Sequence, residues 1–339
     1  MKTDTFASLI EDDILAKHLH SEWIAEETTA RQSLRKKIAF GVDGQFVKYV
    51  FITIQSIIEN SAGESFTFHV ITDENTGDLI AKFRQLVSGS RHAIFLHHIS
   101  PELFKDLPTT SLFSKATYYR LLAPHFIEDA EVLIYMDADI VCLADFSALW
   151  STFSGTDKNI VAVVLEDASL RPSLAAAVGL KSNNYFNAGV MVINVAHWLN
   201  ENISSKTFAL LNQRGKEFRF LDQDALNLIL EDQFRILETK YNTLFMLGHS
   251  QAEYQRLPPA DTTFLHYAGA DKPWQIWNEQ QVCRYYLDVY QRSVWSGQPR
   301  EMPQKDWQAK RMYKLMLRQK KIMPFVKWYL AYFVYRYLK

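Results

Sequence analysis

The sequence is poor in cysteine and has no long hydrophobic run. Its two cysteines, Cys142 and Cys283, have neither a CxxC partner nor a neighbouring histidine, which argues against a cysteine-based metal site. A reduced cytoplasmic protein is the simpler interpretation, although the sequence leaves a disulfide open. The longest apolar stretch, residues 328–335, lies between Lys327 and Arg336 and is far shorter than the roughly 20 residues of a spanning helix. The first residues also lack the pattern of a signal peptide, so we expect a soluble protein that can rest on a membrane.

The chain also lacks an excess of charge of either sign. Its 37 Lys and Arg residues balance 38 Asp and Glu residues, which leaves a formal net charge of −1. Without a basic core patch, this balance argues against a nucleic-acid enzyme. Local charge is uneven, because basic residues far outnumber acidic ones from residue 305 onward. The ordinary glycine and proline content exclude a disordered or collagen-like chain.

Short apolar runs alternate with helical patterns from about residue 36 onward. The runs at residues 132–136, 160–165 and 189–193 are typical of strands that are covered on both faces. Such alternation predicts βαβ units and a mostly parallel sheet, whose ligands bind beyond the carboxyl ends of the strands. We therefore expect three parts: a helical lead-in over residues 1–35, an α/β domain over residues 36–280 and a helical C-terminal region over residues 281–339.

Two aspartates follow the strand-like run at residues 132–136. Asp137 and Asp139 are two residues apart, so in an extended backbone their side chains point the same way. Two carboxylates on one side repel each other unless a cation lies between them, and oxygen ligands suit magnesium or manganese. The alternative is a polar turn in which the aspartates cap a helix near Phe146. For the pair alone, that alternative is the commoner outcome.

A second polar segment follows strand-like residues 263–265. His266 offers a neutral nitrogen to a metal, Gly269 permits close approach of the backbone, and Lys272 offers a positive charge to phosphate oxygens. Taken singly, such a histidine is more often a hydrogen-bonded structural residue, and such a lysine is a solvated surface charge. Together with the aspartate pair they complete a metal–diphosphate site. The nitrogen ligand favours manganese over magnesium.

Six segments resemble glycosyltransferase family 8 and, within it, the bacterial lipopolysaccharide core hexosyltransferases. In chain order they are FGVD at residues 40–43, TYYR at 117–120, MDAD at 136–139, YFNAG at 185–189, DQDALN at 222–227 and the segment 266–274. Each segment alone is weak evidence for the family, whereas the whole set in this order is highly specific for it. The resemblance covers residues 36–277 and the basic tail. It implies a Rossmann-like nucleotide-sugar transferase fold of the GT-A type, with residues 36–280 as the catalytic domain.

The resemblance implies a role for each matching residue of the nucleotide end. Asp43 resembles the acid that binds the uracil, with Gly41 and Gln45 beside it and Phe46 over the base. Taken alone, these residues equally fit a turn at the end of a strand. The resemblance assigns the metal to Asp137, Asp139 and His266, and it adds Ala138, Gly269 and Lys272 to the donor-binding residues.

The sugar end of the donor is assigned in the same way. Arg120 resembles the arginine that reaches the donor sugar or diphosphate, and Asp167 the acid that binds donor-sugar hydroxyls. Asn187 and Gly189 resemble the lining of the donor pocket. Asp222 and Gln223 resemble the pair on the reacting face of the sugar. The alternatives are a helix-surface charge for Arg120, a bulge before a buried strand for the pocket lining, and a helix N-terminus for the last pair.

The implied function is that of a metal-dependent retaining glycosyltransferase. It would move a hexose, glucose rather than galactose, from a UDP-sugar to the lipopolysaccharide core, with Mn²⁺ as cofactor and Mg²⁺ as second choice. Its retaining mechanism stays open between front-face attack and a covalent intermediate. The alternatives are another acceptor, a non-catalytic binder of UDP-sugars or envelope glycans, and a nucleotidyltransferase or UDP-sugar hydrolase. The last would need a basic, glycine-rich phosphate loop that residues 40–44 lack.

The expected partners follow from this function. They are the UDP-hexose donor, a lipid-linked oligosaccharide acceptor and the anionic cytoplasmic face of the bacterial inner membrane; no nucleic acid is expected. Residues 311–339 interleave Lys and Arg with aromatic residues, a pattern that favours the headgroup boundary of a bilayer. The alternative is a helix that packs on the catalytic domain with its basic residues facing water.

Overall fold

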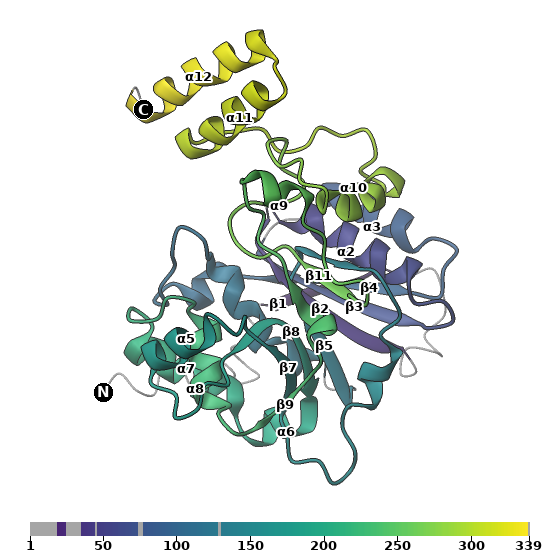
Figure 1. The fold of residues 1–339 in the computed structure, drawn as a ribbon. Coiled ribbons are helices and arrows are strands. Elements are labelled where there is room, and N and C mark those ends of the chain that lie inside the picture. The colour runs from purple at the N-terminus through teal and green to yellow at the C-terminus, as the bar shows by residue number, and fades with distance from the viewer. Residues whose placement is uncertain (1–18, 25–34, 45, 74–76, 128–129, 338–339) are drawn as a thin grey trace. The chain divides into compact units, whose positions relative to one another are not determined.

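The computed structural model describes residues 19–24, 35–44, 46–73, 77–127 and 130–337 (Figure 1). The chain divides into two compact units, of which the first comprises Met1–Leu244 and Pro259–His266 and the second Phe245–Pro258 and Tyr267–Lys339. The predicted boundary at residue 280 between a catalytic domain and a C-terminal region stays a prediction. Gln45, a predicted uracil neighbour, lies outside the described residues.

The first unit is built on a central sheet with the strand order β1-β4-β3-β2-β5-β8-β7-β9. Its strands are β1 (Leu19–Ile24), β2 (Lys36–Val42), β3 (Phe66–Thr72), β4 (Ala93–Ile99), β5 (Val132–Met136), β7 (Val161–Leu165), β8 (Phe186–Asn194) and β9 (Phe234–Ile236). β2 runs parallel to β3 and β5, β3 to β4, and β7 to β9. The predicted α/β class with a mostly parallel sheet is therefore confirmed.

The prediction of a helical lead-in over residues 1–35 is wrong at residues 19–24, which the structure describes as a strand. Residues 19–24 form strand β1, which pairs antiparallel with β4, for example Trp23 with Phe95. The pairing satisfies the backbone groups of an edge strand, and no local pattern marks such a non-local contact. The other residues of the segment 1–34 lie outside the described residues.

Strand β8 departs from its parallel neighbours in direction. It runs antiparallel to both β5 and β7, although its apolar run has the composition of a covered parallel strand. Its register with β7 shifts, so that Val163 pairs with Met191 and Val164 with Asn187. The backbone of residues 188–190 therefore bulges, and a bulge re-aims side chains and frees backbone groups for other partners.

A three-stranded sheet, ordered β10-β11-β6, completes the first unit. Its strands are β6 (Ile140–Cys142), β10 (Thr243–Leu244) and β11 (Phe264–His266). In the antiparallel register of β11 and β6, His266 pairs with Ile140. The pairing places the histidine next to the residue that follows Asp139, although the two lie far apart in the sequence.

Helices and short 3-10 turns surround the central sheet of the first unit. The α-helices are α2 (Val47–Glu59), α3 (Gly77–Val87), α4 (Ala123–Phe126), α5 (Arg171–Val178), α6 (Val195–Asn200), α7 (Ile203–Arg214) and α8 (Asp222–Ile229), and the 3-10 helices are η3 (Pro101–Phe104), η4 (Lys115–Leu121), η5 (Ser147–Ser151) and η6 (Thr239–Asn242). α2 is buried around most of its circumference, as expected for a helix that is apolar on several sides; its buried residues are Val47, Tyr49, Val50, Phe51, Ile52, Thr53, Ile54, Ser56 and Ile57.

The second unit is helical, as expected for the C-terminal region. It contains α9 (Gln251–Gln255), α10 (Cys283–Arg292), α11 (Asp306–Arg318) and α12 (Ile322–Tyr337). α11 and α12 pack on each other around a cluster of buried residues: Trp277, Ala309, Met312, Leu315, Met316 and Trp328. Within the described ranges, no helix has the length and apolarity needed to cross a bilayer.

Candidate functional site

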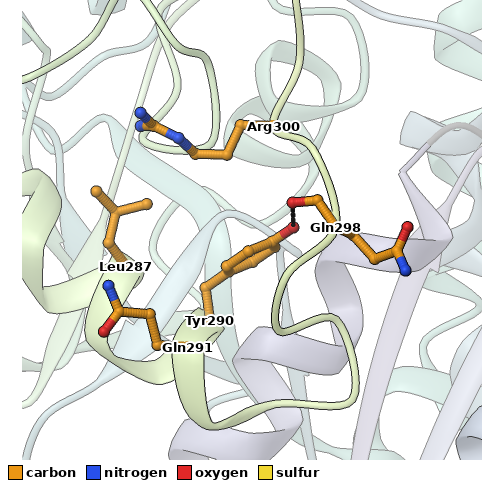
Figure 2. A pocket seen from close by; sticks show the side chains of 5 residues that line it. All are labelled: Leu287, Tyr290, Gln291, Gln298 and Arg300. Carbon is orange, nitrogen blue, oxygen red and sulfur yellow. Dashed lines mark hydrogen bonds between the residues drawn. The ribbon is translucent and has the colours of Figure 1, made fainter.

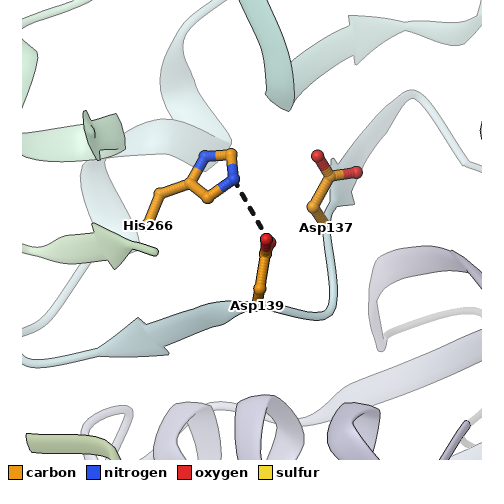
Figure 3. A group of neighbouring side chains, drawn as sticks. All are labelled: Asp137, Asp139 and His266. Atoms are coloured by element: carbon orange, nitrogen blue, oxygen red, sulfur yellow. Dashed lines mark ion pairs between the residues drawn. The ribbon is translucent and has the colours of Figure 1, made fainter. Parts of the chain in front are cut away.

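Three predicted metal ligands meet in the first unit. Asp137 and Asp139 follow the end of β5, and His266 ends β11. The ligand atoms of the three side chains all lie within 4.8 Å of one another. Nε2 of His266 is 3.2 Å from Oδ1 of Asp139, and the side chains point toward a common centre (Figure 3). Two carboxylates and one imidazole form a donor set that suits a divalent cation such as manganese.

The local packing fits such a site. The His266 ring is 4% exposed, and it lies against Gly189 in the bulge of β8. A Cβ atom on Gly189 would overlap this ring, lying 2.8 Å from Nδ1 of His266. The carbonyl oxygen of Gly189 also accepts a hydrogen bond from the backbone N–H of Asp137, at 2.8 Å. Gly189 therefore holds the predicted ligand Asp137 through its carbonyl oxygen, and its lack of a side chain leaves room for the ring of His266.

Nδ1 of His266 contacts Asn242, a residue that sequence reasoning missed. It lies 2.9 Å from Oδ1 of Asn242, whose Nδ2 donates to Oδ1 of Asn187, also at 2.9 Å. Asn187 in turn donates from Nδ2 to Oε1 of Glu166 at 2.8 Å. Asn187 is thus joined to His266 through Asn242, and its place in the lining of the donor pocket stays a prediction. No local pattern marks Asn242 or Glu166.

Arg120 connects the metal cluster to Asp222. Its Nη2 donates to Oδ1 of Asp137 at 3.0 Å, and its Nε lies 2.9 Å from Oδ2 of Asp222. Its Nη1 donates to the carbonyl oxygen of Ala188 at 2.5 Å. Burial by itself would lower the pKa of Arg120, but the carboxylates of Asp137 and Asp222 raise it above its ordinary value. Arg120 is therefore a permanent charge that holds two carboxylates in place.

Asp222 and Gln223 begin α8, which agrees with the alternative of a helix N-terminus, and their place at the reacting face of the sugar stays a prediction. Leu221, before them, has a φ of 43°, in a region that strains a non-glycine residue. Asp222 is buried and accepts a hydrogen bond from the hydroxyl of Thr117. Burial raises the pKa of Asp222 to about 6, although Arg120 and Thr117 oppose the shift.

The amide of Gln223 is occupied at both ends. Its Oε1 accepts a hydrogen bond from the backbone N–H of Ala188 at 3.0 Å, and its Nε2 donates to the hydroxyl of Tyr185 at 3.2 Å. Together with Arg120, which binds the carbonyl of Ala188, Gln223 satisfies the backbone groups that the β8 bulge frees. Gln223 thereby fixes the shape of this wall of the site.

Asp167 differs from its expected role in its contacts. Its carboxylate is exposed and accepts hydrogen bonds from the backbone N–H and the hydroxyl of Ser169, at 2.8 and 2.5 Å. These bonds lower the pKa of Asp167 below its ordinary value. The neighbouring Glu166, and not Asp167, contacts Asn187. A sugar-binding role for Asp167 stays a prediction.

The predicted uracil end lies after β2. Asp43 accepts hydrogen bonds from the hydroxyl of Ser114 at 2.8 Å and from the backbone N–H of Phe46 at 3.2 Å. The ring of Phe46 is 36% exposed, which leaves an aromatic surface for a base. The N–H of Gly41 donates to the hydroxyl of Tyr135 at 3.2 Å. Ala138 is buried, and its carbonyl oxygen accepts a hydrogen bond from Thr53.

Gly269 and Lys272 belong to the second unit. Gly269 has a φ of 88°, a left-handed conformation that glycine adopts without strain. Nζ of Lys272 donates to the carbonyl oxygen of Tyr267 at 2.7 Å, which orders the loop. This unit also has a cavity of about 300 Å³, shown in Figure 2. Its lining offers no carboxylate or imidazole for a metal: Leu287, Tyr290, Gln291, Gln298 and Arg300.

Comparisons with known proteins bear on this arrangement. The sequence model of Glycosyl transferase family 8 matches residues 37–278. The chain is 33% identical to lipopolysaccharide 1,2-glucosyltransferase of Escherichia coli, over 84% of this chain and 87% of that protein. It is 32% identical to lipopolysaccharide 1,3-galactosyltransferase of Salmonella typhimurium, over 87% of this chain and 90% of that protein.

Solved structures agree in fold. The galactosyltransferase LgtC, in complex with donor and acceptor sugar analogs, superimposes with a TM-score of 0.63 at 21% identity and covers 76% of this chain and 96% of its own. The bifunctional glycosyltransferase WbbM gives a TM-score of 0.64 at 19% identity, over 80% of this chain and 52% of its own. At these identities the likeness concerns the fold alone, and it confirms the predicted GT-A type.

Proposed function

The chain belongs to glycosyl transferase family 8, and on this premise we propose that it transfers glucose from UDP-glucose to a sugar of the lipopolysaccharide core with retention of configuration. The observation that carries the proposal is the cluster of Asp137, Asp139 and His266, which Arg120 joins to the buried Asp222. The names of the two similar enzymes of E. coli and Salmonella support a hexose donor and a lipopolysaccharide acceptor. One transfers glucose and the other galactose, so the choice of glucose rests on the donor test below.

Asp137, Asp139 and His266 would hold a divalent metal, for which we propose Mn²⁺. Such a metal, when bound, acts as a Lewis acid that offsets the negative charge growing on the diphosphate leaving group. Arg120 keeps Asp137 in its orientation through the hydrogen bond from Nη2. Gly269 and Lys272 keep their proposed donor-binding roles on the resemblance alone.

Asp222 is the proposed electrostatic partner of the reacting sugar. Departure of the diphosphate leaves positive charge on the sugar ring, and a buried carboxylate stabilises this oxocarbenium-like state. The ion pair with Arg120 and the hydrogen bond from Thr117 favour the ionised form of Asp222 that this role requires.

The contacts of Gln223 support front-face attack by the acceptor. A covalent intermediate on Gln223 would need Oε1 to attack the sugar, but this atom accepts the hydrogen bond of the Ala188 N–H. We therefore propose that the acceptor hydroxyl attacks from the side of the leaving group and passes its proton to a phosphate oxygen. Gln223 shapes the pocket wall in this scheme.

We further propose that α12 rests on the anionic cytoplasmic face of the bacterial inner membrane. One side of the helix packs on α11 through Trp328, while the other exposes an apolar stripe with Met323 82% and Leu330 59% exposed. Lys321 and Lys327 are exposed on the same helix region. Apolar side chains flanked by basic ones suit an interfacial helix, each basic residue adding about 1 kcal/mol near an anionic surface.

A donor panel tests the proposed transfer. The protein is incubated with Mn²⁺, a truncated lipopolysaccharide acceptor and either UDP-glucose or UDP-galactose, and the product is examined by NMR. We expect turnover of UDP-glucose and a coupling constant typical of an α-glycoside. Preference for UDP-galactose would correct the donor, and a β-glycoside would contradict retention.

A further inference from the structure

The side chain of Asn242 lies between the predicted metal ligand His266 and the amide of Asn187. We propose that Asn242 is a positioning residue, which holds the imidazole of His266 with its proton on Nδ1 and its lone pair on Nε2. The inference rests on the proposed role of His266 as a metal ligand and deepens it. The position of the proton follows from the donor-to-acceptor direction of a chain of hydrogen bonds that begins at the backbone N–H of Gly189.

The orientation of the Asn187 amide is fixed at both ends. A backbone N–H can only donate, and the N–H of Gly189 lies 2.9 Å from one terminal atom of the Asn187 amide. That atom must therefore be the oxygen, Oδ1. The other terminal atom must be Nδ2, and it lies 2.8 Å from a carboxylate oxygen of Glu166, which accepts. Both contacts therefore require the same assignment of the oxygen and nitrogen atoms of the Asn187 amide. Such assignments are made from the hydrogen-bond network around the amide.

The direction passes from Asn187 to Asn242. Because Oδ1 of Asn187 accepts, the atom of Asn242 that lies 2.9 Å from it must donate and is Nδ2. The remaining terminal atom of Asn242 is then Oδ1, which faces Nδ1 of His266 at 2.9 Å. An oxygen of this kind only accepts, so Nδ1 must carry a proton. In the neutral imidazole the other nitrogen, Nε2, then has a lone pair.

Burial makes this choice of tautomer strict. Asn242 is 0% and His266 is 4% exposed, so water competes little for these groups. A lone pair of Nδ1 facing Oδ1 of Asn242 would leave both buried groups without a partner, which costs about 1–3 kcal/mol. The hydrogen-bond chain therefore favours a proton on Nδ1 and leaves Nε2, which faces Asp139, as the nitrogen that can bind a metal.

The chosen tautomer is the one that a metal site requires. With its lone pair on Nε2, His266 presents an acceptor to Oδ1 of Asp139, 3.2 Å away. Two acceptors at this distance repel each other and attract a cation between them. Metal-bound histidines commonly donate their other ring N–H to such an oxygen, and loss of this partner weakens metal binding about 10–100-fold.

Nitrogen NMR of the metal-free protein tests the tautomer without any activity. His266 is assigned by comparison with His266→Gln in a ¹⁵N-histidine sample, which is followed through rising pH until the ring signals no longer change. We expect the proton on Nδ1 in the wild type and in Asn242→Asp, because either form of that carboxyl group accepts from Nδ1. Asn242→Leu removes the acceptor and should move the proton to Nε2, where Asp139 accepts it.

Mn²⁺ binding, followed by electron paramagnetic resonance, tests the consequence. We expect about 10–100-fold weaker binding by Asn242→Leu and a smaller loss by Asn242→Asp, which keeps an acceptor for Nδ1 of His266 but loses the donor to Oδ1 of Asn187. Thr207→Val, a buried change at a side chain whose hydroxyl donates to the carbonyl oxygen of Ile203 in the same helix, is the control for lost stability and should bind normally. A proton on Nε2 in the wild type, or unchanged binding by Asn242→Leu, overturns the inference. Failure of the wild type to bind Mn²⁺ would instead refute the metal role, with the tautomer result still readable by NMR.

Discussion

Nε of Arg120 lies 2.9 Å from Oδ2 of Asp222, and both side chains are almost fully buried. The arginine also donates to Asp137, so one guanidinium serves two carboxylates. Removal of one member of a buried pair leaves an uncompensated charge, which costs about 3–5 kcal/mol. Arg120 is therefore the electrostatic centre of the proposed site.

This relationship predicts non-additive losses of stability. Arg120→Met should lower the free energy of unfolding by about 3–5 kcal/mol, because the buried carboxylate of Asp222 and the partly exposed carboxylate of Asp137 lose their cation. In the double variant Arg120→Met/Asp222→Asn the loss should be smaller than the sum of the single losses, since one of the stranded charges is gone. Urea titrations of the four proteins measure the coupling. Additive losses would mean that the interaction between Arg120 and Asp222 does not contribute to the free energy of unfolding.

Gly189→Ala should impair the metal site more than the fold. The added methyl group would overlap the ring of His266, so we expect Mn²⁺ binding to weaken at least about 10-fold, a loss within the range for disturbed ligand geometry. Gly155→Ala is the matched control, because nothing lies within 4 Å of a Cβ atom at that position. Equal Mn²⁺ affinity of the two variants in calorimetry would show that the ring is not held against Gly189.

Three buried histidines predict acid sensitivity. Burial lowers the pKa of His92 to about 4 and that of His97 to about 3, and it lowers the pKa of His69 well below its ordinary value, where His97 and Lys37 add to the shift. The unfolded chain binds protons near pH 6.5 and the folded chain does not, so stability falls as the pH drops below 6.5. By about pH 5, which is 1.5 units below the ordinary pKa of histidine, His92 and His97 each contribute a loss of roughly 2 kcal/mol.

Because the pKa of Asp222 is raised in the folded protein, its protonation adds stability as the pH falls, which offsets part of the loss from the histidines. A variant is therefore needed to isolate the contribution of the histidines. His92→Asn can still accept the hydrogen bond that the backbone N–H of Phe66 donates to Nδ1 of His92 at 3.2 Å. We expect its stability, measured in urea between about pH 7 and pH 5, to fall less steeply than that of the wild type. An identical slope would show that His92 does take up a proton when folded.

The exposed stripe of α12 predicts vesicle binding. Met323→Glu/Leu330→Glu should weaken sedimentation with vesicles rich in anionic lipid at least 10-fold, because two charges replace apolar contacts at the interface. Lys216→Glu changes the net charge equally at an exposed turn residue that follows α7 in the first unit, and it serves as control. Unchanged binding by the double variant, or equal loss in the control, would contradict docking through this face.

Local patterns explain which parts of the molecule the sequence could predict. The buried runs ending at Met136 and Ile193 were visible because apolar composition marks covered strands, and the spacing of Asp137 and Asp139 showed their common direction. The direction of β8 was not visible, because an apolar run has the same composition in either direction. The bulge at residues 188–190 likewise depends on pairing with other strands.

Residues that act through others escaped sequence reasoning. Asn242 and Glu166 have no motif of their own, and they join the site only because η6, β7 and β8 come together. Asp167, which the resemblance placed at the donor sugar, turns its carboxylate to Ser169. Composition and resemblance therefore predicted the three side chains that cluster, while the side chains that orient them required the structure.

Turnover of UDP-glucose by wild type and Asp139→Asn, with Mn²⁺ and with excess chelator, tests the central claim most directly. The substitution removes the charge of one proposed ligand at little steric cost, so the variant should fold normally, as its circular dichroism would show. We predict a loss of several orders of magnitude in kcat for the variant and of nearly all activity for the chelated wild type. Full activity of a folded Asp139→Asn, or of the wild type in excess chelator, would contradict a metal-dependent transferase.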